Sequence, residues 1–155
     1  MAELPPQSAR ELARLLDASR PQPDLTAAIQ RCACTGELRA GLFLINGDWV
    51  QAHVVSQELS SPLAAHWHAL VHRHEPDFPN SKYWLRKVGD SPIYPRLAEL
   101  AGDPAGAAGV VTDGRWEPYL FTDQFAAGNP GDWTRQTDQM EMQLLLEYCL
   151  SREES

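Results

Sequence analysis

The densest set of chemically active residues in the sequence is a group of histidines, four of which lie within nine residues, between His66 and His74. On a helix, where each residue turns by about 100°, His68, His72 and Glu75 share one face. Imidazole and carboxylate groups bind divalent metals such as zinc, and imidazole also transfers protons near neutral pH. The spacing therefore predicts a metal or proton-transfer site on this helix. His66 and His74 fall on other faces, where we expect them to be exposed to solvent.

His53, in the preceding helical segment, is a further candidate for the same site. It lies on a stripe with Val50 and Val54 that would face the histidine-rich helix if the two segments packed together. The spacing H-x-x-x-H also occurs in zinc-binding helices. Ala69 stands where the metalloprotease motif H-E-x-x-H has its glutamate, which argues against a metalloprotease. The candidate ligands for a divalent metal such as zinc are His53, His68, His72 and Glu75.

Polar and aromatic residues on both sides of this helix are candidates for binding a ligand. They are Gln57, Arg73, Asp77, Asn80, Tyr83 and Trp84. Three interpretations of the region remain open from the sequence: a hydrogen-bonded network that fixes how the helices dock, a ligand or metal pocket, and a catalytic site. An arginine beside two carboxylates most often forms a paired network that holds a loop, and only sometimes an anion site.

Capping residues and turn signals divide the chain into helices. Ser8 and Glu11 form a capping box, and Ser61 followed by Pro62 is typical of a helix start. The expected helices cover about residues 8–18, 24–34, 37–46, 48–59, 62–75, 80–88, 92–101, 118–126 and 133–151. Short connections near Gly47 and Pro76 predict antiparallel neighbours. The segment Gly102–Gly114 is expected to be a surface loop, and no strand is expected. The fold class is therefore all-α, a single domain over residues 1–155 built from packed antiparallel helical hairpins.

Composition and charge narrow the classes of partner. The 155 residues are 43% hydrophobic and 22% charged, as in an ordinary soluble globular protein. The formal net charge of -8 disfavours nucleic acid as a partner, although Arg73, Lys82, Arg86 and Lys87 are close in sequence. No segment approaches the apolar run of about 18 residues that a membrane span needs, so no membrane partner is expected. Three cysteines, an odd number without a CxxC pair, favour the reducing cytoplasm.

Two stretches 29 residues apart share a pattern: GDWVQA, beginning at Gly47, and PDFPNS, beginning at Pro76. In each, a turn residue precedes an aspartate cap, an aromatic residue follows, and a small residue lies four positions after the aspartate. This pattern resembles the helix-turn-helix arrangement of tetratricopeptide-like repeats, in which small residues let two helices approach closely. The resemblance implies that part of the chain is tetratricopeptide-like.

The histidine-rich stretch and the helix after it also resemble an uncharacterised family of small proteins. The family pattern is close to His-Ala-x-x-His-Arg-x-Glu-Gly-Asp-x-x-Asn-Ala-x-Tyr-Trp-x-Arg-x-x-Gly. The matching positions here are His68, Ala69, His72, Arg73, Glu75, Asp77, Asn80, Tyr83, Trp84, Arg86 and Gly89. This chain departs from the pattern at Pro76 and Ser81, where the family has Gly and Ala. The resemblance implies no particular activity.

Two functions are consistent with these features. The first is a cytoplasmic helical module that binds an unidentified small molecule or protein through the histidine and glutamate site. The alternative is a metal-assisted hydrolase that uses His53, His68, His72 and Glu75. The chain has neither a glycine-rich phosphate loop nor a G-x-S-x-G nucleophile turn. A homodimer is also a candidate assembly, because the last helix carries an apolar stripe formed by Met140, Leu144, Leu145 and Tyr148.

Overall fold

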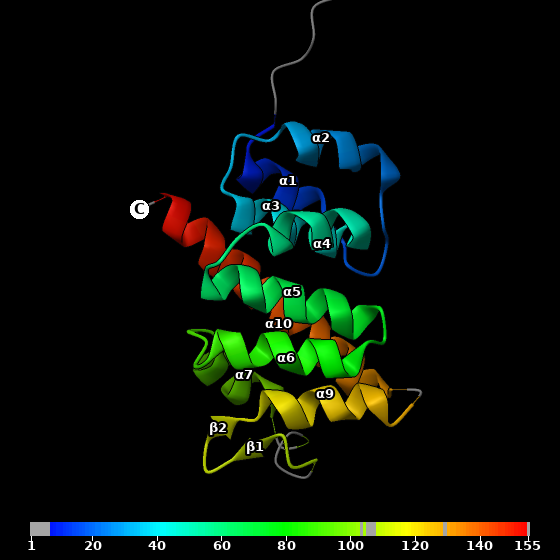
Figure 1. Ribbon diagram of the computed structural model, residues 1–155, viewed down its shortest axis with the longest axis vertical. Helices are drawn as coiled ribbons and strands as arrows, with labels where there is room; N and C mark the ends of the chain where they lie inside the picture. Colours follow the sequence, from blue (N-terminus) through cyan, green and yellow to red (C-terminus); the bar gives the residue numbers. More distant parts are fainter. Residues whose placement is uncertain (1–6, 103, 105–107, 129, 155) are drawn as a thin grey trace, which may run out of the picture.

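The predicted all-α fold is confirmed. The computed structural model describes residues 7–102, 104, 108–128 and 130–154, and helices dominate this part of the chain (Figure 1). The helices are α1 (Ala9–Leu15), η1 (Pro23–Leu25), α2 (Thr26–Arg31), α3 (Gly36–Ile45), α4 (Trp49–Gln57), α5 (Pro62–His74), α6 (Phe78–Val88), α7 (Tyr94–Ala101), α9 (Pro118–Ala126) and α10 (Asp132–Glu154). In the described residues no helix is long and apolar enough to cross a membrane.

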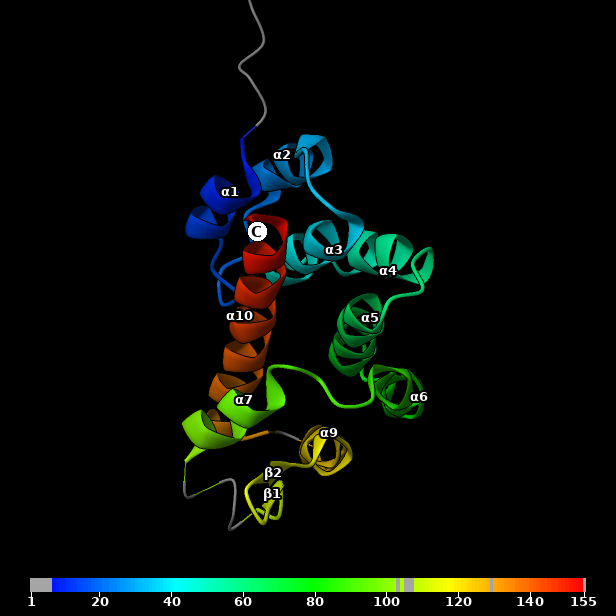
Figure 2. The same ribbon diagram turned by 90° about the vertical axis from the view of Figure 1, so that its left-hand side faces the viewer.

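The helices from α3 to α6 pack in chain order, with α9 against α6 (Figure 1). The long helix α10 runs along the other side of the molecule and contacts α3 and α7 (Figure 2). The predicted neighbours around Gly47 and Pro76 are therefore confirmed as the pairs α3–α4 and α5–α6. Helix α5 packs between α4 and α6, and hydrogen bonds join another of its sides to α10, so side chains on several of its faces are buried.

Local sequence explains where these helices start and how closely they pack. The side chains of Thr35, Ser61 and Asp77 accept hydrogen bonds from backbone N–H groups in the first turns of α3, α5 and α6. Where α3 crosses α5, Gly41 lies directly against the indole of Trp67. A Cβ atom at Gly41 would lie 2.4 Å from Cζ2 of that ring, which is fully buried. A glycine is required at this crossing because no side chain fits there.

The Gly41 contact leads to a stability prediction. Replacing Gly41 with alanine should lower the free energy of unfolding by about 1–3 kcal/mol, because the ring of Trp67 or helix α3 must move. Urea unfolding followed by circular dichroism measures the change. Gly131→Ala is the matched control, since a Cβ atom there meets nothing within 4 Å, and it should change stability by less than about 0.5 kcal/mol. Equal effects of the two substitutions would contradict the close approach.

The expectation of no strand is wrong at one short hairpin. Strands β1 (Val111–Thr112) and β2 (Arg115–Trp116) pair antiparallel, with Val111 opposite Trp116. The two residues between them, Asp113 and Gly114, have φ values of 53° and 75°. An Asp-Gly pair with positive φ at both positions is a strong hairpin signal, and it lies at the end of the predicted loop Gly102–Gly114. Residues 103 and 105–107 of that loop lie outside the described residues.

The buried apolar side chains form one continuous core, to which α3, α5, α7 and α10 contribute. The apolar stripe on the last helix is part of this core: Leu145 is fully buried, and Met140, Leu144 and Tyr148 are half-buried against it. Most of the stripe is therefore used inside the chain. A homodimer through this helix remains a prediction.

Candidate functional site

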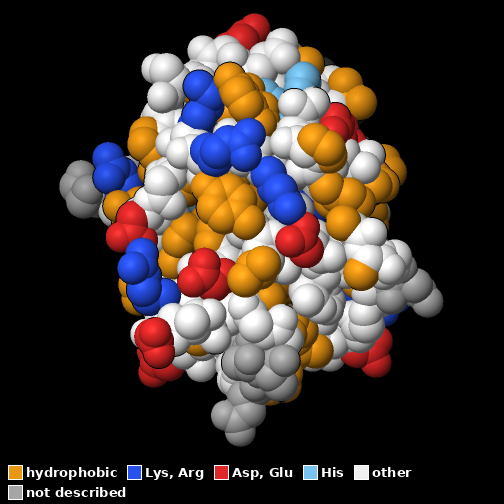
Figure 3. Space-filling model, turned by 60° about the horizontal axis from the view of Figure 1, so that its bottom comes forward, with side chains coloured by type: hydrophobic (Ala, Val, Ile, Leu, Met, Phe, Trp, Pro, Cys, Tyr) orange, Lys and Arg blue, Asp and Glu red, His pale blue; other side chains and the backbone are white. Residues whose placement is uncertain are grey.

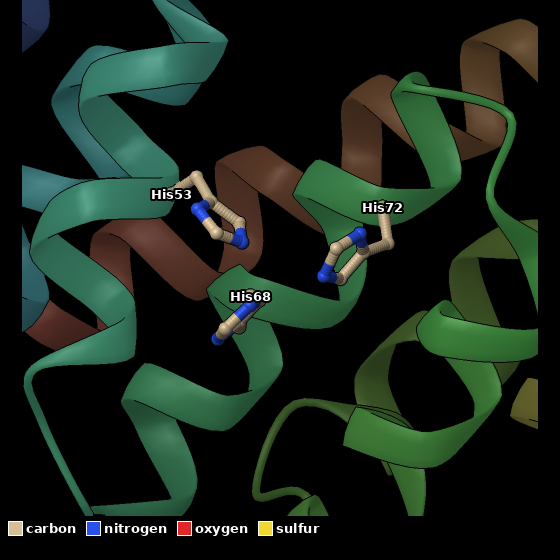
Figure 4. Close-up of side chains that lie close together, drawn as sticks. All are labelled: His53, His68 and His72. Carbon is tan, nitrogen blue, oxygen red and sulfur yellow. The ribbon is translucent and has the colours of Figure 1, made fainter.

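Three histidines converge between α4 and α5. Figure 4 shows His53 on α4 facing His68 and His72 on α5. One ring nitrogen from each residue lies within 4.8 Å of the others. The ring centroid of His53 lies 4.7 Å from that of His68 and 5.2 Å from that of His72. The structure thus brings together the three predicted imidazoles, although they come from positions far apart in sequence.

Neighbouring side chains hold the rings of this group. The indole of Trp84 on α6 stacks on the ring of His68, with centroids 3.9 Å apart and planes inclined by 16°. His68 and His72 are themselves nearly parallel, because residues four apart lie one above the other on a helix. His68 and His72 are buried and His53 is half-buried. The site is therefore closed on the sides of α5 and α6 and open towards solvent near His53.

Two predicted site residues with carboxylate side chains, Glu75 and Asp77, lie beside the three histidines and not among them. Oε2 of Glu75 is 3.5 Å from Nδ1 of His72, and Oδ2 of Asp77 is 3.8 Å from the same nitrogen. Asp77 also caps α6 and accepts a hydrogen bond from the side chain of Asn80. These two distances to His72 are longer than a hydrogen bond, and a small rotation of either carboxylate would form one, which would orient the ring and make its other nitrogen a better metal ligand. Glu75, expected among the ligands, is placed to support His72 instead.

Burial favours the neutral form of His68 and His72. Desolvation, together with the neighbouring His72 and His53, lowers the pKa of His68 to about 4. Desolvation also lowers the pKa of His72, while Glu75 raises it and opposes this effect. The Nδ1 atoms of His68 and His72 are buried and have no hydrogen-bond partner among the described residues. A buried polar atom without a partner costs about 1–3 kcal/mol, and a metal that accepts the lone pair of Nδ1 would remove this cost at His68. At His72, Nδ1 lies beside the carboxylates of Glu75 and Asp77, which leaves Nε2 for a metal.

The arrangement fits a divalent transition metal. Imidazole nitrogens bind zinc at about 2.0–2.1 Å, and two such bonds at a tetrahedral angle place the nitrogens about 3.4 Å apart. The ring nitrogens of the three histidines lie within 4.8 Å of one another, so small side-chain rotations would bring them to this separation. Sets of imidazole ligands suit zinc, copper, nickel and iron. The residues present therefore fit a metal held by three histidines.

The other predicted ligand-binding residues lie apart from this group. Gln57 is exposed at the end of α4, and Asn80 is exposed at the start of α6. Tyr83 is largely exposed and touches Trp84 edge to face. Arg73 is completely buried on the opposite side of α5. Of the six residues expected to bind a ligand, only Trp84 and Asp77 adjoin the three histidines.

A second buried cluster joins the opposite side of α5 to α10. Nη1 of Arg73 donates to Oδ1 of Asp138 at 3.0 Å and to Oε1 of Glu141 at 2.8 Å. Nε2 of His66 lies 2.8 Å from Oε2 of Glu141, and Nε2 of His74 lies 2.9 Å from Oδ2 of Asp138. The expectation that His66 and His74 are exposed was wrong: His66 is fully buried and His74 is mostly buried. They are buried because α10 covers this side of α5.

The sequence did contain a signal for this cluster. Asp138 and Glu141 lie on the same stripe of the last helix as Leu145 and Cys149, which are buried. Carboxylates on a buried stripe need a cationic or hydrogen-bonding partner, because unpaired charges are not stable in a protein interior. That requirement points to arginine and histidine elsewhere in the chain, but it does not tell which ones.

The pairing of Arg73 with Glu141 predicts how the free energy of unfolding changes at acidic pH. Burial would raise the pKa of Glu141, but Arg73 and His66 lower it to about 2, below its ordinary value of 4.5. Because the folded pKa is the lower one, the ionised carboxylate contributes stability above about pH 4.5, and this contribution is lost as the pH falls towards about 2. Wild type should therefore exceed Glu141→Gln in free energy of unfolding at about pH 7, and the gap should shrink at about pH 3. Urea unfolding measures both values, and a gap that stays constant or widens in acid would contradict this pairing.

The basic residues of α6 do not form a single positive surface. On the lower face of the molecule, Lys and Arg side chains are mixed with hydrophobic and acidic ones (Figure 3). Lys82 pairs with Asp123 of α9, and the amino group of Lys87 lies 5.1 Å from the ring centroid of Tyr83. These residues therefore have structural partners within the chain, as Arg73 does.

Comparisons with known proteins assign neither a family nor a function to this chain. No protein-family model, curated protein or solved structure matches this chain. The resemblance of the stretch around His68 and Tyr83 to an uncharacterised family stays a prediction. The function is therefore inferred from the geometry of the site, in which three converging imidazoles on two neighbouring helices are the most specific chemical feature.

Proposed function

We propose that the protein binds a divalent transition metal of the zinc type through His53, His68 and His72. The observation that carries this proposal is the convergence of three imidazole nitrogens to within 4.8 Å of one another. Two of the rings are buried and favour the neutral form, which is the form that binds metals. Glu75 and Asp77 beside Nδ1 of His72 are placed to orient that ring.

Several features support an open coordination position. Zinc in a site of this kind has three protein ligands and a fourth position for water or another molecule. His53 is half-buried, and the helix that carries it exposes Val50 and Val54 to solvent. A small molecule with a metal-binding atom could therefore reach the metal from this side. On this proposal the protein is a metal-dependent ligand-binding module, and its three free cysteines favour the reducing cytoplasm.

Calorimetric titration of zinc into protein prepared without a polyhistidine tag tests the proposal. We expect one equivalent to bind, and His53→Ala to weaken binding by at least about tenfold, since losing one of three ligands costs more than losing a supporting contact. His74→Gln is the matched control, because His74 pairs with Asp138 and lies outside the group. Equal losses in the two variants, or zinc binding that His53→Ala leaves unchanged, would contradict the assignment.

A metal-assisted hydrolase is the second candidate. The observation that favours it is the half-exposed position of His53, which leaves room for a metal-bound water at the open position. Against it, the two nearby carboxylates lie on the Nδ1 side of His72, where they support the ring and are not placed as a general base. Zinc-dependent hydrolysis of an activated ester by wild type, lost in His53→Ala and kept in His74→Gln, would favour this candidate. Equal rates in all three proteins would exclude it.

A further inference from the structure

A separate cavity lies on the side of α5 away from the three histidines. Its volume is about 510 Å³, within the range of small-molecule sites. It is bounded by the first turns of α3 and α5, the connection from α6 to α7, and the last turns of α10, elements that can be followed in Figure 2. Nothing in the proposed metal site uses this cavity, since none of the three metal-binding histidines lines it.

The charges around the cavity are mainly negative. Three carboxylates line it, from Glu37, Asp90 and Glu153, against one guanidinium, from Arg152. The formal charge of these four side chains is therefore -2, before the partial charges of the helix ends are counted. The positive N-terminal ends of α3 and α5 and the negative C-terminal ends of α6 and α10 all meet here, so the helix dipoles largely cancel. The cavity consequently favours a cation.

The polar groups around the cavity add capacity to accept hydrogen bonds. Ser61 donates to Oε1 of Glu37 at 2.8 Å, and the backbone N–H of Thr35 donates to Oε1 of Glu153 at 2.8 Å. Each ionised carboxylate has about four lone-pair sites, so both groups can accept further donors. Ser61 and Thr35 also accept from the first turns of their own helices. A ligand that donates several hydrogen bonds therefore suits this lining.

A buried histidine forms part of the wall of the cavity. His66 lines the cavity and is fully buried, and its Nε2 is bonded to Glu141, which does not line the cavity. Because that carboxylate also accepts from Arg73, it is ionised and can only accept, so Nε2 carries a hydrogen. In the neutral ring Nδ1 is then an acceptor. Nδ1 of His66 has no partner among the described residues, but it is fully buried, so the ring closes the wall and does not itself contact a ligand.

Apolar side chains complete the lining. Leu63, Val88 and Pro92 come from three different elements, and the ring of Tyr148 joins them. Taken together, we propose that this cavity binds a small molecule that carries a protonated primary amine on an apolar or aromatic body. The ammonium group donates its hydrogen bonds to the carboxylates around the cavity, and the body packs against the apolar wall. This inference does not depend on the proposed metal site.

The test uses two probes of the same shape and opposite charge, benzylamine and benzoate. Both are titrated into the full chain in the presence of a chelator, and amide resonances are followed by NMR. We expect benzylamine to shift resonances of residues around the cavity, such as Ser61 and Ser91, with a Kd below about 10 mM. Benzoate should leave them unchanged. Binding of benzoate as strong as that of benzylamine, or no binding of benzylamine, would overturn the proposal.

Variants connect the binding to the carboxylates. Asp90→Asn combined with Glu37→Gln should weaken benzylamine binding by at least about tenfold, because two of the three negative charges are removed. Glu99→Gln on α7 is the matched control, since this exposed carboxylate lies outside the cavity, and it should not change the affinity. If the double variant does not fold, Asp90→Asn alone, at an exposed position, takes its place. It should also weaken benzylamine binding, by less than is expected for the double variant. An unchanged affinity in the folded variants would overturn the proposal.

Discussion

Zinc binding is expected to weaken by more than about a hundredfold when His68 is replaced with alanine. Loss of a residue that only supports a metal ligand costs about 10–100-fold in affinity, and loss of a buried ligand costs more. His68 is the most enclosed member of the group, because it is buried and stacks on Trp84. Titration with zinc in competition with a chelator of known affinity measures the change.

The same variant separates metal binding from stability. In wild type, free zinc at about 100 times its Kd should raise the free energy of unfolding by about 2.7 kcal/mol. In His68→Ala this increase should disappear. Without metal the variant should lose only about 1 kcal/mol, from the stacking on Trp84. A loss of several kcal/mol in the metal-free protein, with zinc binding unchanged, would make His68 a structural residue and contradict the metal assignment.

The second large effect concerns the buried arginine. Arg73→Met should lower the free energy of unfolding by about 3–5 kcal/mol, because it leaves Glu141 and Asp138 buried without their cation. The stem of methionine fills part of the space of the arginine, so the effect reports mainly on charge. Urea unfolding at neutral pH measures it, and Arg86→Met, at an exposed position of α6, should stay within about 0.5 kcal/mol of wild type.

A compensating substitution makes this prediction specific. Adding Glu141→Gln to Arg73→Met removes one of the two buried carboxylates that have lost their arginine, so the double variant should be more stable than Arg73→Met alone. Zinc binding should persist in the folded double variant, because the cluster lies on the opposite side of α5 from the three histidines. If Arg73→Met is as stable as wild type, the buried pairing with α10 does not hold.

The helices could be predicted because their signals are local. Ser8 and Ser61 cap helices by hydrogen bonds to residues three positions later, so sequence alone places these helix starts, whereas α6 begins at Phe78, two residues before the expected start. The meeting of His53 with His68 and His72 could also be predicted, because a short connection makes α4 and α5 neighbours. The Asp113–Gly114 hairpin was missed although its signal is equally local.

The burial of His66 and Arg73 could not be predicted in the same way. Their partners Glu141 and Asp138 lie 75 and 65 positions further along the chain, on a helix whose packing side is set by the whole core. Periodicity predicts one buried face for a helix, whereas α5 is covered on several faces. The cavity lined by His66 and Glu37 was missed for the same reason, because it forms only where four helix ends meet.

X-ray absorption at the zinc edge of the protein loaded with one equivalent of zinc tests the metal assignment most directly. We expect a first shell of nitrogen and oxygen atoms at about 2.0–2.1 Å, with the multiple-scattering pattern of three imidazoles. A sulfur shell at about 2.3 Å would instead place the metal on the cysteines Cys32, Cys34 or Cys149. That result, or fewer than two imidazoles per zinc, would contradict a site formed by His53, His68 and His72.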